Sequence, residues 1–506
     1  MPEKIFSCAR FNLDALLSLA GGLRGRECVC NVAAAPKTGS MNWAIFVSFD
    51  DGLDWVFRSP RSGPHAIVSD ESAQKMLLSE VATLKFLRNN TSVPVPEVYS
   101  FSGSYDNHVG VPYILMSKAA GRPLSDYDWA NILRQTPGYP QLRPLLPLPD
   151  GTREIVMKQL GALMRQLSTL RFEKIGSLFE DDSGNYVVGE CLSPTLTWQE
   201  RDSLDGIERG PFLHESQYLE SLISALISHV KELPLSPHAF FAPIPDHSEY
   251  SSWSSYRAAV RRWNDYVAIG AKIDSSKNRL SYCLAGQVLR QMIPHLSTPN
   301  DSYTLSHPDL HPGNIFVDEK FNIVCLIDWG SASSGPISEL LATPGLGSSA
   351  FAPPKQLVSA FRCGFCPEHP LPAGSWERAD MIWYFSRLVR LLSTQDYRLF
   401  QALYKLVSEI EVEDAEIPGL FNELAAEEKN QHLLAMLRAD DYTASELKQE
   451  EDAAFGCGKT DKGDNRAVAR KLTVMAEINR NFLANSKLWR WIERALRERD
   501  DDYLGN

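Results

Sequence analysis

The first 120 residues alternate between short apolar runs and turn signals, a pattern typical of strands joined by tight turns. Several such runs lie in residues 27–58, where an Asp-Gly pair separates two of them as in a hairpin. Residues 70–89 place apolar side chains at the spacing of an amphipathic helix, which two following prolines end. Residues 111–118 predict a buried strand. We therefore expect a small sheet with one helix, preceded by a short helix that begins near Asn12.

From about residue 125 onward, the apolar positions follow the longer period of helices. The clearest amphipathic stretches are residues 153–170, 217–233, 257–273, 281–296 and 470–500. A small sheet followed by many helices indicates an α+β chain with two lobes. We expect a small antiparallel β-sheet lobe in residues 1–118 and a large, mostly helical lobe in residues 119–506.

Composition narrows the possible functions. The 506 residues are 44% hydrophobic and 23% charged, as in ordinary globular proteins, and the net charge is −12. An acidic chain is poorly suited to nucleic acid or anionic membranes, so we expect neither partner. Nine cysteines do not suggest a disulfide framework, and we expect a cytoplasmic protein. A mitochondrial presequence at the N-terminus is the alternative, and the oligomeric state is not predicted.

The most informative segment is residues 305–330, LSHPDLHPGNIFVDEKFNIVCLIDWG. Two short apolar strands flank a turn there, and such a hairpin brings Asp328 back beside Asn314. An amide oxygen and a carboxylate together suit Mg²⁺, which takes its remaining ligands from water and phosphates. Asp309 lies on the same loop, where it can accept a proton from a hydroxyl. This arrangement is the one that phosphoryl transfer requires.

The run from His307 to Asn314, followed by Ile-Asp-Trp-Gly, resembles the catalytic loop and metal-binding motif of the aminoglycoside phosphotransferase family. The stretches EVATLKFLRNNTSVPVPEVY, YILMSKAAGRPL and LWRWIE are also similar to fungal members, so the resemblance spans about residues 12–500. It implies a protein-kinase-like two-lobe fold. It also implies ATP and Mg²⁺ as cofactors and transfer of the γ-phosphoryl group to a hydroxyl of a small molecule.

The resemblance also implies roles on the sheet side. Arg58 stands where the family carries a Lys that reaches the phosphates, and Arg binds phosphate as a planar fork instead of a point charge. Glu80, in the following helix, is its expected ion-pair partner. His307 is expected to hold the catalytic loop by hydrogen bonds.

Two further segments are expected to contact the nucleotide. Gly39 and Ser40 lie in a turn that would cover the phosphates, although the Gly-rich pattern of protein kinases is missing. The backbone of Met116 and Lys118, with the intervening Ser117, would bind the adenine where the two lobes join.

Alternatives stay open at this point. A protein kinase is one, although Phe-Ala-Pro-Pro at 351–354 replaces the expected Ala-Pro-Glu. A nucleotide-binding module without catalysis is another, because of Arg58. The run that ends in Lys459 matches a relaxed P-loop, but a charged stretch precedes it instead of a strand. The Cys363–Cys366 pair has no second half and indicates no zinc site. The acceptor is not predicted, and acidic stretches would suit a polycation.

Overall fold

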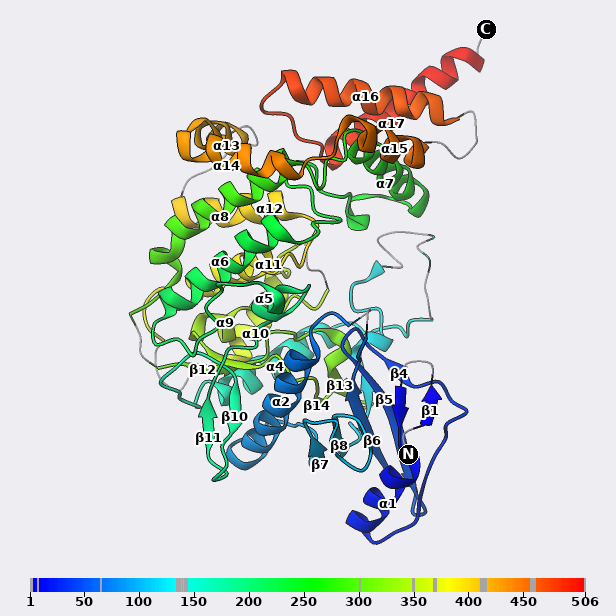
Figure 1. Cartoon of the computed structure of the whole chain (residues 1–506), viewed down its shortest axis with the longest axis vertical. Helices are drawn as coiled ribbons and strands as arrows, with labels where there is room; N and C mark the ends of the chain where they lie inside the picture. The colour runs from blue at the N-terminus through cyan, green and yellow to red at the C-terminus, as the bar shows by residue number, and fades with distance from the viewer. Residues whose placement is uncertain are drawn as a thin grey trace.

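A computed structural model describes residues 3–504, except 7–8, 64–65, 133–137, 139, 141–143, 300–301, 348–350, 367–370, 410–415 and 456–460. A small lobe built on a β-sheet lies at one end, and helices stack above it toward the C-terminus (Figure 1). The expected α+β organisation into an antiparallel sheet lobe and a mostly helical lobe is confirmed. The boundary after residue 118 stays a prediction.

The sheet of the small lobe is antiparallel throughout, in the order β3-β5-β6-β8-β7, with β4 also pairing with β5. Its strands are β3 (Cys28–Cys30), β4 (Lys37–Thr38), β5 (Asn42–Phe49), β6 (Asp54–Pro60), β7 (Val98–Ser102) and β8 (Tyr113–Ser117). The predicted hairpin joins β5 to β6, and Gly52 in its turn has φ +82°. A left-handed turn of this kind favours glycine.

The two faces of the sheet pack against different elements. Trp55 and Phe57 of β6 point to the side covered by α1 (Leu13–Arg24), where they join an aromatic core. Because side chains alternate along a strand, Arg58 points to the opposite side, towards α2 (Asp70–Asn90). This alternation delivers a charged side chain to the cleft between the lobes.

Helix α2 begins at an N-cap, Ser69, whose side chain accepts a hydrogen bond from the Ser72 amide. Its buried face carries apolar side chains at helical spacing, such as Met76, Leu77 and Leu84. Glu80 lies on the same face and is 2% exposed. A buried carboxylate in an apolar stripe needs a partner, and it finds one in the cleft described below.

Most of the remaining described chain is helical. Its longer helices are α4 (Thr152–Leu167), α6 (Glu215–Glu232), α7 (Trp253–Ala268), α8 (Ser276–Leu296), α10 (Lys355–Phe365), α11 (Ser375–Val389), α12 (Asp396–Ser408), α13 (Glu416–Ala426), α14 (Glu428–Leu437), α15 (Ala444–Phe455), α16 (Asp461–Ile478) and α17 (Ser486–Leu504). Shorter helices are α5 (Pro194–Thr197) and α9 (Ile337–Leu341). The predicted helices within 153–296 and at the C-terminus are confirmed.

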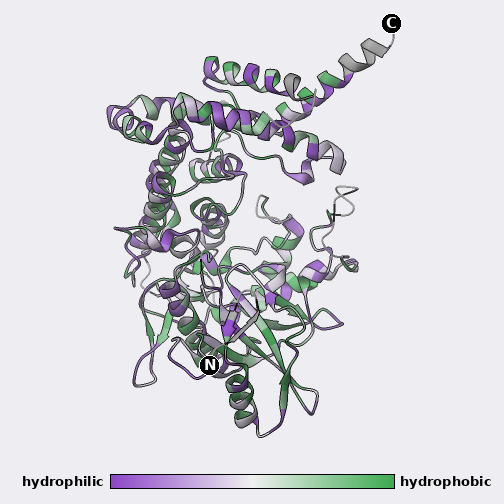
Figure 2. Cartoon of the chain, turned by 45° about the vertical axis from the view of Figure 1, so that its right-hand side comes forward, coloured by the Kyte–Doolittle hydropathy of each residue, from purple (hydrophilic) through white to green (hydrophobic). Residues whose placement is uncertain are grey.

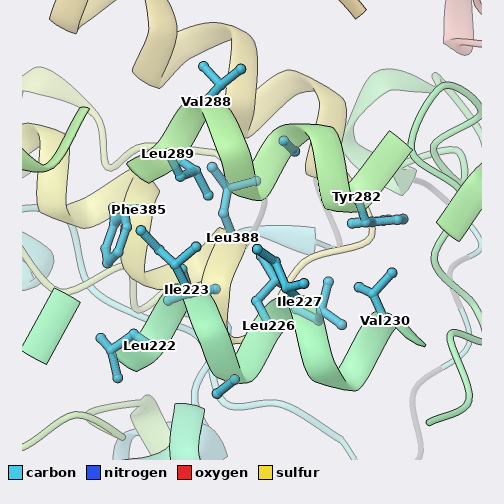
Figure 3. Packing of buried hydrophobic residues seen from close by; sticks show 14 of the residues in the cluster. Leu222, Ile223, Leu226, Ile227, Val230, Tyr282, Val288, Leu289, Phe385 and Leu388 are labelled. Atoms are coloured by element: carbon cyan, nitrogen blue, oxygen red, sulfur yellow. The ribbon is translucent and has the colours of Figure 1, made fainter. Parts of the chain in front are cut away.

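The core of the large lobe forms where α6, α8 and α11 meet. Figure 3 shows apolar side chains of α6 pointing towards those of the other two helices. Figure 2 shows the apolar character of the sheet strands and more polar stretches on the outer helices. At the C-terminus, Trp489 is buried against α7 whereas Trp491 is 61% exposed, as expected for the core and surface of one helix.

Two features differ from the sequence-based expectation. The chain begins with a small hairpin, β1 (Glu3–Phe6) and β2 (Ala9–Phe11), before α1. The run at 27–35 is a strand only over β3, since a turn follows directly. Among the described residues, no helix is both long and apolar enough to cross a bilayer.

Candidate active site

The catalytic segment folds as the sequence predicts. Strand β12 (Thr304–Ser306) leads into the loop, and the turn η4 (Pro312–Asn314) opens the hairpin of β13 (Ile315–Val317) and β14 (Ile323–Leu326). After β14, the Ile327 amide donates to the Asn314 carbonyl at 3.0 Å. This bond places Asp328 beside Asn314, the juxtaposition expected from the hairpin.

His307 links the catalytic loop to the returning strand. Its Nε2 lies 2.9 Å from the Ile327 carbonyl, and its Nδ1 lies 3.3 Å from the Asp309 amide. The carbonyl can only accept and the amide can only donate, so the ring is neutral, with its proton on Nε2. Burial lowers the pKa of His307, in agreement with this state. The ring therefore connects the end of β14, directly before Asp328, to the loop that carries Asp309.

Arg58 crosses the cleft between the lobes. It forms an ion pair with Glu80, as expected, and its second guanidinium nitrogen lies 3.3 Å from Asp328 Oδ1. The pair is buried, with side-chain exposures of 11% for Arg58 and 3% for Glu80. Burial opposes the charge of Arg58, but the two carboxylates outweigh it and raise the pKa of the guanidinium.

Glu80 also contacts the turn that follows Asp328. Its second oxygen accepts from the Trp329 amide at 3.2 Å, and a Cβ on Gly330 would lie 3.3 Å from the Glu80 carboxylate. Asp328 itself has φ +69°, a left-handed conformation that is costly for a side-chain-bearing residue. The contacts with α2 and β6 hold this turn in place.

Two cavities meet at Asp309. The first, of about 30 Å³, lies between the lobes. It is lined by Met41, Asn42, Arg58, Pro60, Val68, Ala73, Met76, Leu77, Glu80, Trp198, Asp309, Asp328, Gly330 and Ser331. The second, of about 430 Å³, lies inside the helical lobe and is within the size range of small-molecule sites. Asp309 lines both cavities, so one acidic residue borders the two spaces.

The second cavity contains charged residues that the sequence did not single out. Arg390, at the end of α11, donates to the Pro308 carbonyl at 2.7 Å and lies 3.9 Å from Asp309. Arg387 and Glu339 also line this space. The signal in the sequence was a pair of arginines three residues apart within an apolar helix, but it did not indicate which space they face.

Other predicted residues lie away from the cavities. Gly39 closes its turn by donating to Asn42, so Met41 and Asn42, and neither Gly39 nor Ser40, line the first cavity. Lys118 pairs with Asp54 at 2.7 Å, and Met116 is buried in β8; neither lines either cavity.

Part of the backbone around Lys118 that was expected to bind the adenine already forms hydrogen bonds within the protein. The Ser117 amide is already bonded to the Glu97 carbonyl at 2.8 Å. The nucleotide roles of Met116, Lys118, Gly39 and Ser40 stay predictions. Cys363 and Cys366 are exposed and free, and Lys459 lies outside the described residues.

Asn314 and Asp328 fit a magnesium ion that completes its shell elsewhere. Asn314 Nδ2 donates to the Asp309 carbonyl at 2.9 Å, which leaves the amide oxygen as a ligand. Within the described part of the chain, no group of three or more His, Cys, Asp or Glu could hold a metal by itself. Two oxygen ligands from the protein agree with the way Mg²⁺ binds together with phosphates.

Comparisons with curated proteins find fungal relatives. A subtelomeric hrmA-associated cluster protein of Aspergillus fumigatus is 26% identical over 338 residues, covering 61% of this chain and 58% of that protein. The altered inheritance of mitochondria protein 9, mitochondrial, of Yarrowia lipolytica is 23% identical over 314 residues, covering 59% of this chain and 48% of that protein. The chain therefore spans only about half the length of these relatives.

Solved structures with similarity include a putative fructosamine-3-kinase from Thermobifida fusca, at 15% identity and TM-score 0.41, covering 78% of this chain and 98% of that one. A macrolide 2'-phosphotransferase type I has 12% identity and TM-score 0.36, covering 85% and 97%.

The family comparison falls on the catalytic segment itself. Residues 243–342 match the model of the phosphotransferase enzyme family, and this range contains Asp309, Asn314 and Asp328. The segment that contains the hairpin and Asp309 is thus similar to the phosphotransferase enzyme family, in agreement with the resemblance predicted from its motif.

Proposed function

We propose that the protein transfers the γ-phosphoryl group of ATP, with Mg²⁺, to a hydroxyl group of a small molecule. The observation that carries this proposal is the position of Asp309 in the wall of both cavities. A transferase needs a donor space and an acceptor space that meet at one base. The family match over residues 243–342 supports the same reaction class.

The residues divide the work as follows. Arg58 binds phosphate oxygens from the sheet side, and Asn314 and Asp328 hold the metal. The bound metal supplies neutralisation of the phosphate charge. Asp309 orients the acceptor hydroxyl and takes its proton while the acceptor oxygen bonds to the γ-phosphorus and the bond to the ADP oxygen breaks. His307 takes no proton, since both ring nitrogens are engaged in holding the loop.

One observation favours a second candidate, a protein that binds nucleotide without efficient transfer. Arg58 contacts Asp328, and this contact competes with a metal for the same carboxylate. If this contact restrains catalysis, Arg58→Lys should raise ATP turnover. The single ammonium group of Lys cannot contact Glu80 and Asp328 at the same time as the planar guanidinium of Arg does, so Asp328 would be released for the metal. If transfer is already efficient, Arg58→Lys should lower it.

We keep the cytoplasm as the proposed location, and the mitochondrion as its alternative. A relative in Yarrowia lipolytica carries a mitochondrial name, which belongs to that protein. Microscopy of the full-length protein with a C-terminal fluorescent fusion in a fungal cell would separate the two.

The direct test has two stages. Mg-ATP at millimolar concentration should raise the melting temperature, because a ligand that binds the native state stabilises it by mass action. Purified protein with Mg-ATP and a fractionated cell extract should then yield a product heavier by one phosphate, seen by mass spectrometry. Folded protein with no melting shift in Mg-ATP, Mg-ADP or the GTP equivalents would overturn the proposal.

A further inference from the structure

The second cavity presents two guanidinium groups on one face of α11. Arg387 and Arg390 are three residues apart, which puts them on the same side of the helix about one turn apart. Arg390 is the one nearer the catalytic loop, through its bond to the Pro308 carbonyl and its 3.9 Å approach to Asp309. Arg387 therefore lies about one helical turn further from the base.

Arg387 has little to compensate its charge. Its guanidinium lies over the Trp383 ring at 3.6 Å and donates to the Trp383 carbonyl at 3.1 Å. Among the described residues it forms no ion pair, and its buried Nε has no hydrogen-bond acceptor. Arg390 also has a buried Nε without an acceptor. Burial and the neighbouring Arg390 lower the pKa of Arg387 to about 9, so it stays charged at neutral pH.

The carboxyl groups that line the cavity do not neutralise the positive charge of Arg387. Glu339 accepts from the Tyr218 hydroxyl at 2.9 Å, and burial raises its pKa to about 7, so part of it is neutral. Asp309 is engaged at the catalytic loop. Apolar side chains such as Leu222, Leu340 and Phe385 cover much of the remaining wall. A ligand with an anionic group would therefore compensate the charge of Arg387.

We propose that the acceptor carries a carboxylate or phosphate group that binds Arg387, on a molecule whose hydroxyl reaches Asp309. This rests on the proposed function and names its substrate class. Arg387 lies about one helical turn from Arg390, and Arg390 lies 3.9 Å from Asp309, so a compact hydroxy acid or hydroxyalkyl phosphate can reach both Arg387 and Asp309. An acidic pocket would suit a polycationic acceptor, but among the described residues no acidic stretch lines this cavity.

The first experiment measures binding without catalysis. The protein is saturated with Mg-ADP to occupy the nucleotide side, and its melting temperature is followed in 4-hydroxybutyrate, in 4-hydroxybutyramide, in glycerol 3-phosphate and in the polycation spermine. The carboxylate or the phosphate should raise the melting temperature, and the neutral amide should not. The stronger of the two anions identifies the group. An equal effect of acid and amide, no effect of either anion, or a preference for spermine would overturn the inference.

The second experiment assigns the site to Arg387. Arg387→Gln should weaken binding of the preferred anion about 10–100-fold, as expected for losing a charge-assisted contact, and Arg387→Lys should restore part of it. Arg378→Gln, on the same helix but away from the cavity, is the matched control and should bind the anion like the wild type. Unchanged anion affinity in folded Arg387→Gln would remove Arg387 from the site.

The failure of this inference differs from the failure of the proposed function. If Mg-ADP and Mg-ATP stabilise the protein and phosphate is transferred, but neutral or cationic hydroxyl compounds are the better acceptors, the substrate class is wrong and the reaction stands. If neither nucleotide binds while the hydroxy acid does, the cavity binds an anion and the kinase proposal is wrong.

Discussion

The two cavities that meet at Asp309 differ in how their charges are matched. In the cleft between the lobes, Arg58 is held by Glu80 and Asp328, and little open space remains. In the helical lobe, the cavity is more than ten times larger, and Arg387 lines it without a carboxylate partner in the part of the chain that the structure describes. On the proposed function, the first side would bind a phosphate chain with its metal. The second side would have the charge and the volume to bind a specific acceptor.

Asp309 is the group that the two sides share, so its removal should have the largest effect. Asp309→Asn keeps the shape of the side chain but removes the base. Phosphate transfer should fall by about 10²–10⁴-fold, while the affinity for ATP changes little. Single-turnover transfer and nucleotide titration measure the two quantities separately. Transfer at the wild-type rate would remove Asp309 from its role.

Asp328→Ala should disable the nucleotide side alone. It removes one of the two protein ligands for the metal, and we expect a loss of about 10²–10³-fold in Mg-dependent turnover, as for other single electrostatic contacts to the reacting group. Asn314→Ala should act in the same direction. Lys459→Ala, in the P-loop-like run, is the control and should leave turnover unchanged. The reverse result would move the nucleotide site to the C-terminal run.

The contribution of the buried ion pair between Arg58 and Glu80 can be measured through the stability of the protein. Glu80→Ala leaves Arg58 buried with only the Asp328 contact, and the free energy of unfolding should fall by about 3 kcal/mol. Glu71→Ala, which breaks an exposed pair with Lys75 on the same helix, should cost less than about 1 kcal/mol. Urea denaturation of both variants measures the difference. If both substitutions lowered the free energy of unfolding equally, the buried pair would contribute no more to stability than the exposed pair.

The smallest expected effect concerns the second side. Burial raises the pKa of Glu339 to about 7, so its protonated form favours the folded state. This stabilisation is complete below about pH 4.5 and is lost as the pH rises through 7. Glu339→Gln should flatten the decline in stability between pH 5 and 8 by about 2–3 kcal/mol. Glu220→Gln, from an exposed pair with Arg290, should keep the wild-type profile.

The nucleotide side could be predicted because its parts are local in sequence or follow a simple period. Asn314 and Asp328 are brought together by one short hairpin. The pairing of Arg58 with Glu80 was expected from the family resemblance, and the structure shows how it arises: Arg58 is placed by the alternation of one strand, and Glu80 lies on the buried face of the next helix.

The acceptor side could not be predicted in the same way. Arg387 and Arg390 lie some eighty residues after Asp309, and no local pattern reveals that α11 passes behind the catalytic loop. Their spacing shows a shared helix face, but which cavity that face lines depends on the packing of α6, α8 and α11. The role of the turn at Gly39 stays a prediction, since Met41 and Asn42 line the first cavity, whereas Gly39 and Ser40 do not.

The imidazole of His307 has a consequence for motion between the lobes. It connects the Ile327 carbonyl and the Asp309 amide, so Asp309 and the turn at Asp328 are tied together within the helical lobe. Arg58 and Glu80 belong to the other lobe. If the proposed reaction requires the cleft to open for the nucleotide, the distance from Arg58 to Asp328 would change, while the spacing between Asp309 and Asp328 would stay fixed. The proposed base and metal ligand would then keep their relative positions from one reaction to the next, and only the contacts from the sheet lobe would have to form again.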